Sequence, residues 1–285
     1  MKFKMNRRAV SPVVAIVLMF ALTTAAIGIS LAYMFPSISQ FKDKSYNNSN
    51  NLYFIALDSA IQDLITNNPP MSKQIQINQE EGEFMVDSSW RVLFLLKDVT
   101  GTQSSLVLDE QITRIVHRST AVADYDKGEH RYMIGPQDQD YLFINGSSTL
   151  YNEITVLNSS RTMYEPSFLD LALYYRYALS INYKDAGSTE IYQLDIIHVN
   201  LILNESSLES TMQKHISLQL TYFGTQYEEY GTIDFLNDIE GEIRLLDQYN
   251  HFQNDFPIYF PVNTNFVSHQ INVNIIKIDI GVSFS

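Results

Sequence analysis

The chain has 285 residues, a formal net charge of −13 and no cysteine. The lack of cysteine excludes a disulfide framework and thiolate chemistry. The acidic balance argues against nucleic acid as a partner and against polybasic attachment to anionic lipid, because both need clustered positive charge.

An uncharged apolar segment occupies residues 13–35. As a helix rising about 1.5 Å per residue it would be roughly 35 Å long, enough to cross a bilayer core of about 30 Å. Residues 1–8 carry basic but no acidic side chains, so the positive-inside rule predicts a cytoplasmic N-terminus and an extracellular remainder. A secretory signal has its small-residue cleavage site after a shorter apolar core. Here the step from Arg8 to Ala9 precedes the apolar run, so we expect the run to be retained.

A basic pair, a small residue and Ser-Pro-Val precede the apolar run, in the order Arg7-Arg8-Ala9-Val10-Ser11-Pro12-Val13-Val14-Ala15. This order resembles the N-terminus of archaeal type IV pilins and archaellins. The resemblance implies that a prepilin peptidase cleaves between Arg8 and Ala9, with Arg7, Val10, Ser11 and Pro12 completing the motif. It further implies a leader at residues 1–8 and a helix at 9–35 that leaves the membrane to form a filament core. The implied partners are other pilin-like subunits, a secretion ATPase and a platform protein.

The composition of this segment suits a helix that packs on other helices. Pro12 is tolerated in a first helical turn, and Ser11 before it can cap the helix. Many side chains between Ala15 and Ala32 are small, which lets helix backbones approach closely. The alternative interpretation is a single-span anchor that never polymerises.

Residues 36–70 predict a polar joint followed by an amphipathic helix. The joint, residues 36–51, is rich in asparagine and is expected to be a flexible linker or a loosely helical neck that breaks the long helix. Residues 52–66 return to helical spacing, with an apolar stripe at Leu57, Ala60, Ile61, Leu64 and Ile65. Pro69 ends this helix, because the residue before a proline is disfavoured in the helical region. We expect the stripe to pack on a globular domain.

From Met71 the apolar period changes to two, and short segments separated by glycine turns predict strands. The expected fold class is α+β: a long N-terminal helix and a mainly antiparallel, sandwich-like, extracellular β head. A composition boundary near residues 158–166 divides the head into a first β-rich region, 71–160, and a second, 161–285, which are interpreted as two sub-sheets or two β-domains. Short strands are expected at 105–108 and 112–117, among others.

The second region contains the longer patterns. Residues 171–183 alternate as one strand, and residues 191–203 and 271–284 each change apolar phase midway, as a bulge or strong twist would allow. The C-terminal strand is expected to lie paired inside a sheet, since an open apolar edge favours aggregation. Residues 232–253 carry apolar side chains at helical spacing and predict a helix, weakened by Gly241.

No chemical motif stands out. The six histidines lack zinc-type spacing, and His117 and His198 are expected to be packed or surface residues of strands. Nucleophile elbows and phosphate-binding loops are absent from the sequence. Two acidic groups, at Asp124, Asp126 and Glu129 and at Asp138 and Asp140, depart from a calcium loop and are interpreted as solvated turns. We therefore predict no metal, no cofactor and no catalytic role.

Four Asn-x-Ser/Thr sequons occur in turn-like stretches, at Asn47, Asn145, Asn158 and Asn204, and are candidate glycosylation sites. The resemblance to archaeal pilins implies a structural subunit, minor or adhesive, of an archaeal pilus-like filament at the cell surface. One rival is a membrane-anchored adhesin or receptor with the same ectodomain. The other is an anchored hydrolase with an unrecognised site.

Overall fold

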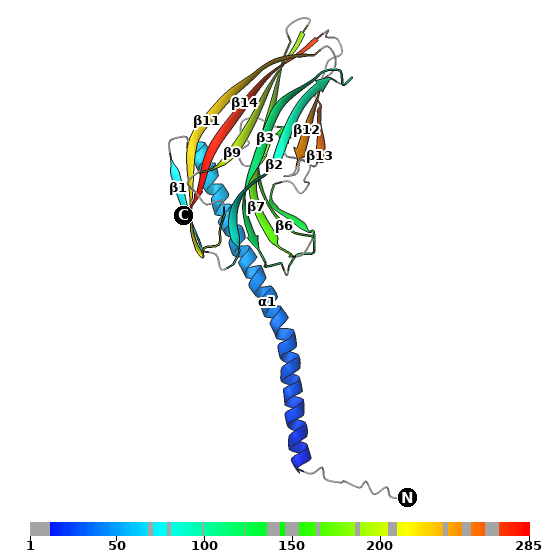
Figure 1. The fold of residues 1–285 in the computed structure, drawn as a ribbon, viewed down its shortest axis with the longest axis vertical. Coiled ribbons are helices and arrows are strands. Elements are labelled where there is room, and N and C mark those ends of the chain that lie inside the picture. The colour runs from blue at the N-terminus through cyan, green and yellow to red at the C-terminus, as the bar shows by residue number, and fades with distance from the viewer. Residues whose placement is uncertain are drawn as a thin grey trace, which may run out of the picture.

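A computed structural model describes residues 12–67, 71–78, 81–98, 100–122, 124–135, 143–145, 154–163, 166–185, 189–204, 210–235, 239–246, 252–259 and 268–285. One long helix, α1 (Pro12–Asn67), leads into a head built almost entirely from strands (Figure 1). The N-terminal part of α1 projects from the head, and its C-terminal part lies against the strands. The prediction of an N-terminal helix followed by a β-rich head is confirmed.

The helix is unbroken over its 56 residues, so the break and the flexible linker expected at 36–51 are wrong, and the stretch is helical, as the alternative of a helical neck predicted. Pro36 lies inside the helix, where a proline removes the N–H that would bond to the carbonyl of Ala32 and crowds that carbonyl, yet the helix continues past it. The asparagine-rich stretch stays helical because the head supplies partners for it: the side-chain amide of Asn47 donates to the carbonyl of Ala121 at 3.1 Å. Tertiary contacts of this kind override weak intrinsic helix propensity.

The strands form two sheets. The first has the order β1, β11, β14, β9, β8, β5, with bounds β1 (Ser72–Asn78), β11 (His215–Phe235), β14 (Ser268–Phe284), β9 (Thr189–Leu203), β8 (Tyr177–Asp185) and β5 (Phe143–Asn145). The second has the order β13, β12, β2, β3, β7, β6, β4, with bounds β13 (Phe252–Tyr259), β12 (Ile239–Leu246), β2 (Glu83–Asp98), β3 (Ser104–Ser119), β7 (Leu169–Tyr175), β6 (Thr155–Arg161) and β4 (His130–Ile134). The short β10 (Ser210–Thr211) pairs with β2.

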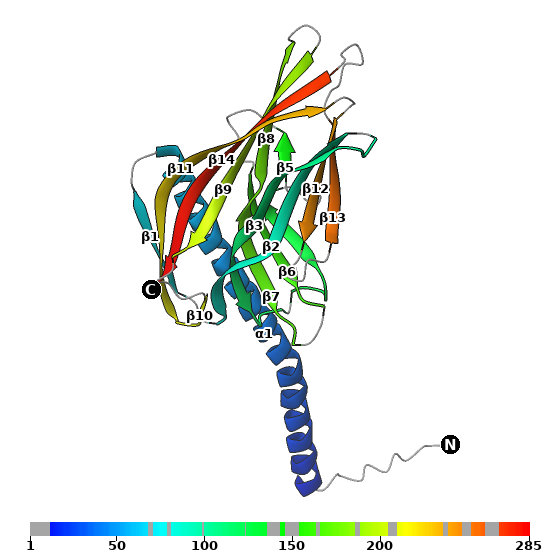
Figure 2. The same cartoon turned by 45° about the horizontal axis from the view of Figure 1, so that its top comes forward.

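Only β14 with β9 and β5 with β8 pair in parallel among the described strands, so the sheets are mainly antiparallel as predicted. Both sheets are curled half-barrels, and the prediction of a sandwich is not confirmed (Figure 2). The predicted regions 71–160 and 161–285 do not correspond to the two sheets, because each sheet takes strands from both regions.

Two apolar cores hold the head together. The helix core joins buried side chains of α1, such as Phe54 and Leu64, to both sheets. The strand core contains side chains of the sheets alone, among them Phe94, Tyr177 and Leu194. Because α1 supplies part of one core, its C-terminal half belongs to the head.

The apolar phase of β14 changes where the two cores meet. Ile271, Val273 and Ile275 lie in the strand core, whereas Ile278 and Ile280 lie in the helix core. Alternate residues of a strand point to opposite faces, so β14 presents a different face to each core. The predicted phase change is thus confirmed, and it needs no bulge between β14 and β9, whose register is continuous.

Three predicted elements differ from the structure. The strand expected at 171–183 is two strands in different sheets, because the chain leaves β7 at Arg176, whose N–H donates to the carbonyl of Ile154. The strands expected at 105–108 and 112–117 are the single strand β3. The helix expected at 232–253 is instead the end of β11, then β12 and β13, since pairing with β14 and β2 outweighs helical spacing.

Candidate functional site

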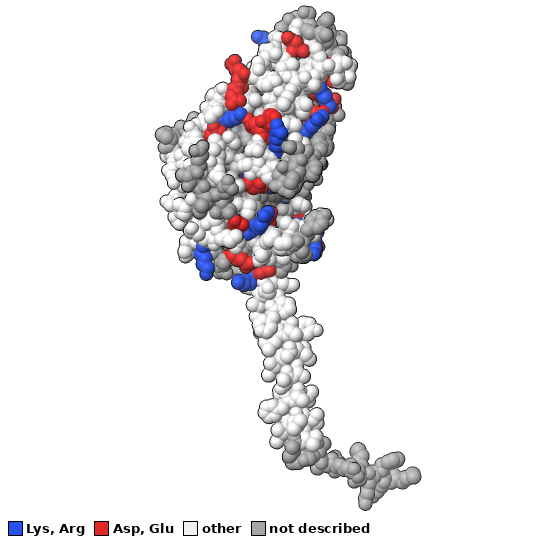
Figure 3. All heavy atoms as spheres, in the orientation of Figure 1, with Lys and Arg blue, Asp and Glu red and all other residues white. Residues whose placement is uncertain are grey.

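The stalk, residues 14–41 of α1, contains no charged residue and is exposed along its length. Its large apolar side chains face solvent: Phe20 is 70% and Tyr33 76% exposed. Figure 3 shows no charged side chain along the stalk on the face drawn, in contrast to the head. Within the described residues, α1 alone is long and apolar enough to span a membrane, by length and composition. An apolar surface of this extent needs lipid or other apolar helices around it.

The C-terminal half of α1 is fixed in the head by packing. Phe54, Leu57 and Ile61 are at most 1% exposed, and the Phe54 ring stacks on Phe84 of β2 with centroids 5.7 Å apart. Ile55, on the opposite side of the helix, is 45% exposed. The predicted apolar stripe is therefore confirmed, and it faces the helix core.

Polar contacts fix the helix where it enters the head. The Tyr46 hydroxyl lies 3.2 Å from Nε2 of His117, and the Asn50 amide nitrogen lies 3.5 Å from Nδ1 of the same ring. The backbone N–H of Glu81 donates to the Tyr46 hydroxyl at 3.1 Å. Burial lowers the pKa of His117 from 6.5 to about 4, so the ring is neutral at pH 7.

A second polar contact lies further along α1. One carboxylate oxygen of Asp58 accepts hydrogen bonds from the Thr155 hydroxyl at 2.9 Å and the Tyr175 hydroxyl at 3.0 Å. Gln62 donates to the Thr155 hydroxyl at 3.0 Å. Hence the helix is bonded to β6 and β7 as well as to β3, and stalk and head form one body.

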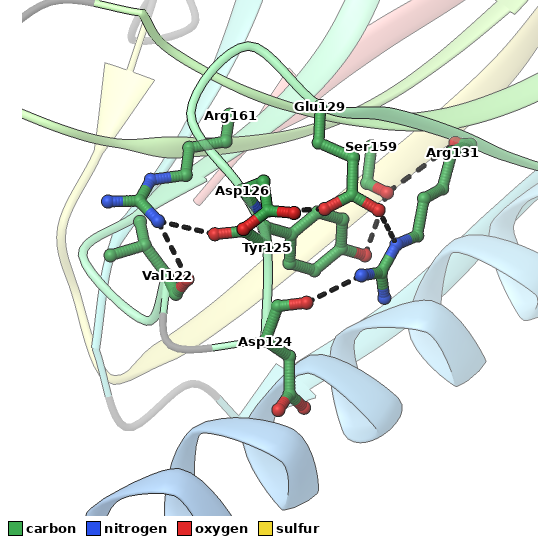
Figure 4. Close-up of polar contacts among 8 residues, drawn as sticks. All are labelled: Val122, Asp124, Tyr125, Asp126, Glu129, Arg131, Ser159 and Arg161. Atoms are coloured by element: carbon green, nitrogen blue, oxygen red, sulfur yellow. Dashed lines mark hydrogen bonds and ion pairs between the residues drawn. The ribbon is translucent and has the colours of Figure 1, made fainter.

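The loop at residues 124–131 is held by arginines (Figure 4). Arg131 donates to Glu129 at 2.6 Å and to the carbonyl of Asp124 at 2.5 Å, and its guanidinium lies 4.0 Å from the centre of the Tyr125 ring. Arg161 donates to the carbonyl of Tyr125. Glu129 is thus committed to an ion pair. Among the described residues no group of three metal-ligating side chains occurs, and Asp138 and Asp140 lie outside them.

A cleft of about 430 Å³ lies between α1 and this loop. Its helix side is lined by Lys44, Asn47, Asn48 and Asn51, and its other side by Asp124, Tyr125, Arg131, Tyr132 and Met133. Polar side chains thus line both sides, Tyr132 and Met133 add apolar surface, and the sequence analysis did not predict this cleft. The sequence does indicate that the helix continues along one side of the cleft, because Tyr46, Asn50 and Phe54 extend the helical spacing of the stripe back through the asparagine-rich stretch.

The structure describes only some of the residues predicted for processing and glycosylation. Arg7, Arg8, Ala9, Val10 and Ser11 lie outside the described residues, and Pro12 begins α1. The turn-like setting predicted for the sequons is wrong at two of them: Asn47 lies within α1, and Asn158 lies in β6 between β4 and β7. Asn145 ends β5, and Asn204 is exposed directly after β9. Use of all four sequons stays a prediction.

Both histidines expected in strands are buried. His117 contacts α1 as described above, and the His198 ring stacks on Tyr177 with centroids 4.1 Å apart. His269 lies 2.8 Å from a carboxylate oxygen of Glu190, which also accepts a hydrogen bond from Tyr192. These histidines pack in separate places, and the described residues do not bring them together as a site.

No protein-family model, curated protein or solved structure matches this chain. Its function therefore has to be inferred from its own residues and geometry.

Proposed function

We propose that the protein is a structural subunit, minor or adhesive, of an archaeal type IV pilus-like surface filament. A prepilin peptidase removes residues 1–8, and the stalk then passes from the membrane into a bundle of like stalks, with the head outside. A secretion ATPase and a platform protein drive this assembly. The proposal assigns no catalytic role to the chain.

One observation carries the proposal: a single helix is apolar and uncovered in its first half and built into the head core in its second half. A plain anchor needs only about 20 apolar residues and no rigid connection to its ectodomain. A filament subunit needs an apolar stalk and a rigid connection between stalk and head, because stacked stalks must fix the positions of the heads. The N-terminal motif from Arg7 to Pro12 supports the same proposal. A single-span anchored adhesin or receptor remains the alternative.

Processing at Arg8 and Ala9 is the first test. The full chain, tagged at its C-terminus, is expressed with a prepilin peptidase, a secretion ATPase and a platform protein, and is sequenced from its N-terminus in membranes and in sheared surface material. We expect the product to begin at Ala9, whereas the Arg8→Asp/Ala9→Ile variant keeps Met1 and is missing from the sheared material. The leader variant Lys4→Ala serves as the control and should be processed normally. An intact Met1 in both fractions of the wild type would contradict the proposal.

Substitution of Gly28 separates a filament from an anchor. A Cβ at Gly28 meets no atom within 4 Å, so Gly28→Leu is compatible with the fold of the single subunit. In a bundle, the larger side chain blocks close approach of neighbouring helices, and we expect at least about tenfold less protein in sheared fibres. The membrane fraction should be unchanged, and Ile27→Leu, an exposed apolar exchange at the adjacent residue, should behave as wild type. Processed wild type that never enters sheared material would favour the anchor.

A further inference from the structure

The polar cleft between α1 and the loop at 124–131 has hydrogen-bonding groups that the protein leaves unused. The side chains of Asn48, Asn51 and Asp124 form no hydrogen bond with another described residue, although all three line the cleft. One side-chain N–H of Asn47 donates to the carbonyl of Ala121. Figure 4 shows that the Asp124 carboxylate points away from the arginine contacts of the loop, toward α1. The cleft therefore offers amide donors, amide acceptors and a carboxylate from opposite walls.

A smaller chamber adjoins the cleft. Its volume is about 10 Å³, and Asn47, Asn51 and Tyr125 line both spaces. Asn50 lines the chamber, is 2% exposed, and has a carbonyl oxygen without a hydrogen-bond partner. An unsatisfied buried acceptor costs about 1–3 kcal/mol, and a chamber of about 10 Å³ has room for about one water molecule, so the space behind the cleft is polar.

The charges of the cleft nearly balance. Lys44 and Arg131 face Asp124, and Arg131 is already paired with Glu129. This balance disfavours both an anion and a metal cation as the ligand. Tyr132 and Met133 add apolar surface. A sugar ring has matching chemistry, since its hydroxyls both donate and accept hydrogen bonds and its C–H faces are apolar. The volume lies in the range of small-molecule sites, about 300–1,000 Å³.

The position of the cleft indicates where such a ring comes from. Phe41 is the last apolar residue of the stalk, and Lys44 and Asn51 follow it by about 4.5 and 15 Å along a helix that rises 1.5 Å per residue. With Phe41 at the outer edge of the apolar core, the cleft begins in the headgroup layer, which adds roughly 5–8 Å on each side of the core, and extends just above it. We propose that this cleft binds a neutral sugar ring, presented as the headgroup of a glycosylated lipid. This assignment of source rests on the membrane-embedded state in the proposed function.

The test uses the full chain in nanodiscs. One set contains phosphatidylcholine alone, another adds a monoglucosyl diacylglycerol, and methyl glucoside in solution serves as the soluble arm. Native mass spectrometry measures the retained lipid, and saturation-transfer NMR measures the soluble sugar. We expect preferential retention of the glycolipid, weakened about tenfold or more in Asn48→Ala/Asp124→Ala, which loses two ligand hydrogen bonds. Asn67→Ala, an exposed asparagine of α1 away from the cleft, is the matched control.

Each result is decisive. If the double variant loses glycolipid retention and keeps the thermal unfolding curve of the wild type, the lipid headgroup is supported. If methyl glucoside binds and glycolipid is not preferred, the sugar site is supported but the lipid source is overturned. The site is overturned if the double variant and Asn48→Trp, whose larger side chain fills the cleft, both bind as the wild type does. A glycan found covalently attached to Asn47 would also overturn it. None of these outcomes alters processing at Ala9, so the proposed function is judged separately.

Discussion

Replacing Phe54 with alanine is expected to lower the free energy of unfolding of the head by about 3–5 kcal/mol. Phe54 is fully buried, stacks on Phe84, and lies in the helix core among side chains of both sheets. Alanine removes most of this contact and leaves a cavity that a helix bonded to the sheets at Asp58 and Tyr46 has little freedom to close. The loss should be visible as a large shift in a urea or thermal unfolding curve of the detergent-solubilised chain.

The neighbouring residue gives the control for this experiment. Ile55→Ala removes a similar apolar side chain from the same helix turn, but Ile55 is 45% exposed and is absent from the helix core. We expect a change below about 1 kcal/mol for it, as for most surface substitutions. Equal effects of the two substitutions would mean that α1 does not pack on the head through this face, and would weaken the argument for one rigid body.

Lowering the pH from 6.5 to 4 is expected to cost the head about 3 kcal/mol through His117 alone. The sign follows from the pKa values: burial lowers the pKa of the folded ring from 6.5 to about 4. Between these values the unfolded chain binds a proton that the folded chain excludes. The stability contributed by the neutral ring therefore decreases as the pH falls across this window, and this contribution is lost fully below it. The hydroxyl of Tyr46, the carbonyl of Glu81 and the carboxylate of Asp170 face the ring, and burial outweighs their effect.

Unfolding of the wild type and His117→Gln by urea at intervals from pH 7 to pH 4 measures this effect. The variant should be less stable at pH 7, because it loses the ring contacts, yet its stability should depend less on pH. Exposed His215 provides the control, since His215→Gln should keep the wild-type slope. A variant slope equal to that of the wild type would show that His117 is not the group that protonates on unfolding.

The N-terminal helix and the alternation of the strands were readable from the sequence for a simple physical reason. Whether a residue faces lipid, core or water is recorded in its own polarity, at a period of 3.6 or 2. This is why the stripe from Leu57 to Ile65 and the phase change of residues 271–284 were predicted correctly. The same local information contains the motif around Arg8 and Ala9, which we propose to be a processing signal rather than a part of the fold.

The predictions that were wrong concern segments whose structure depends on residues far away in the sequence. The asparagine-rich stretch reads as a joint until Asn47 and Asn50 find partners on β3 and the chain after it, far away in sequence. Residues 239–246 fit a helix by spacing and become a strand only because β2 pairs with them. The alternation through 171–183 hides a change of sheet at Arg176.

By itself, then, the sequence determined that a charge-free apolar helical segment precedes a β-rich head in an acidic, cysteine-free chain, and that a basic pair followed by a small residue stands before that segment. The tertiary structure decided that helix and head are one body, where each strand pairs, and that a polar cleft forms where Lys44 to Asn51 pass the loop at 124–131. The reason is physical: polarity and propensity act on each residue locally, whereas strand pairing and clefts depend on contacts between residues that are distant in the chain.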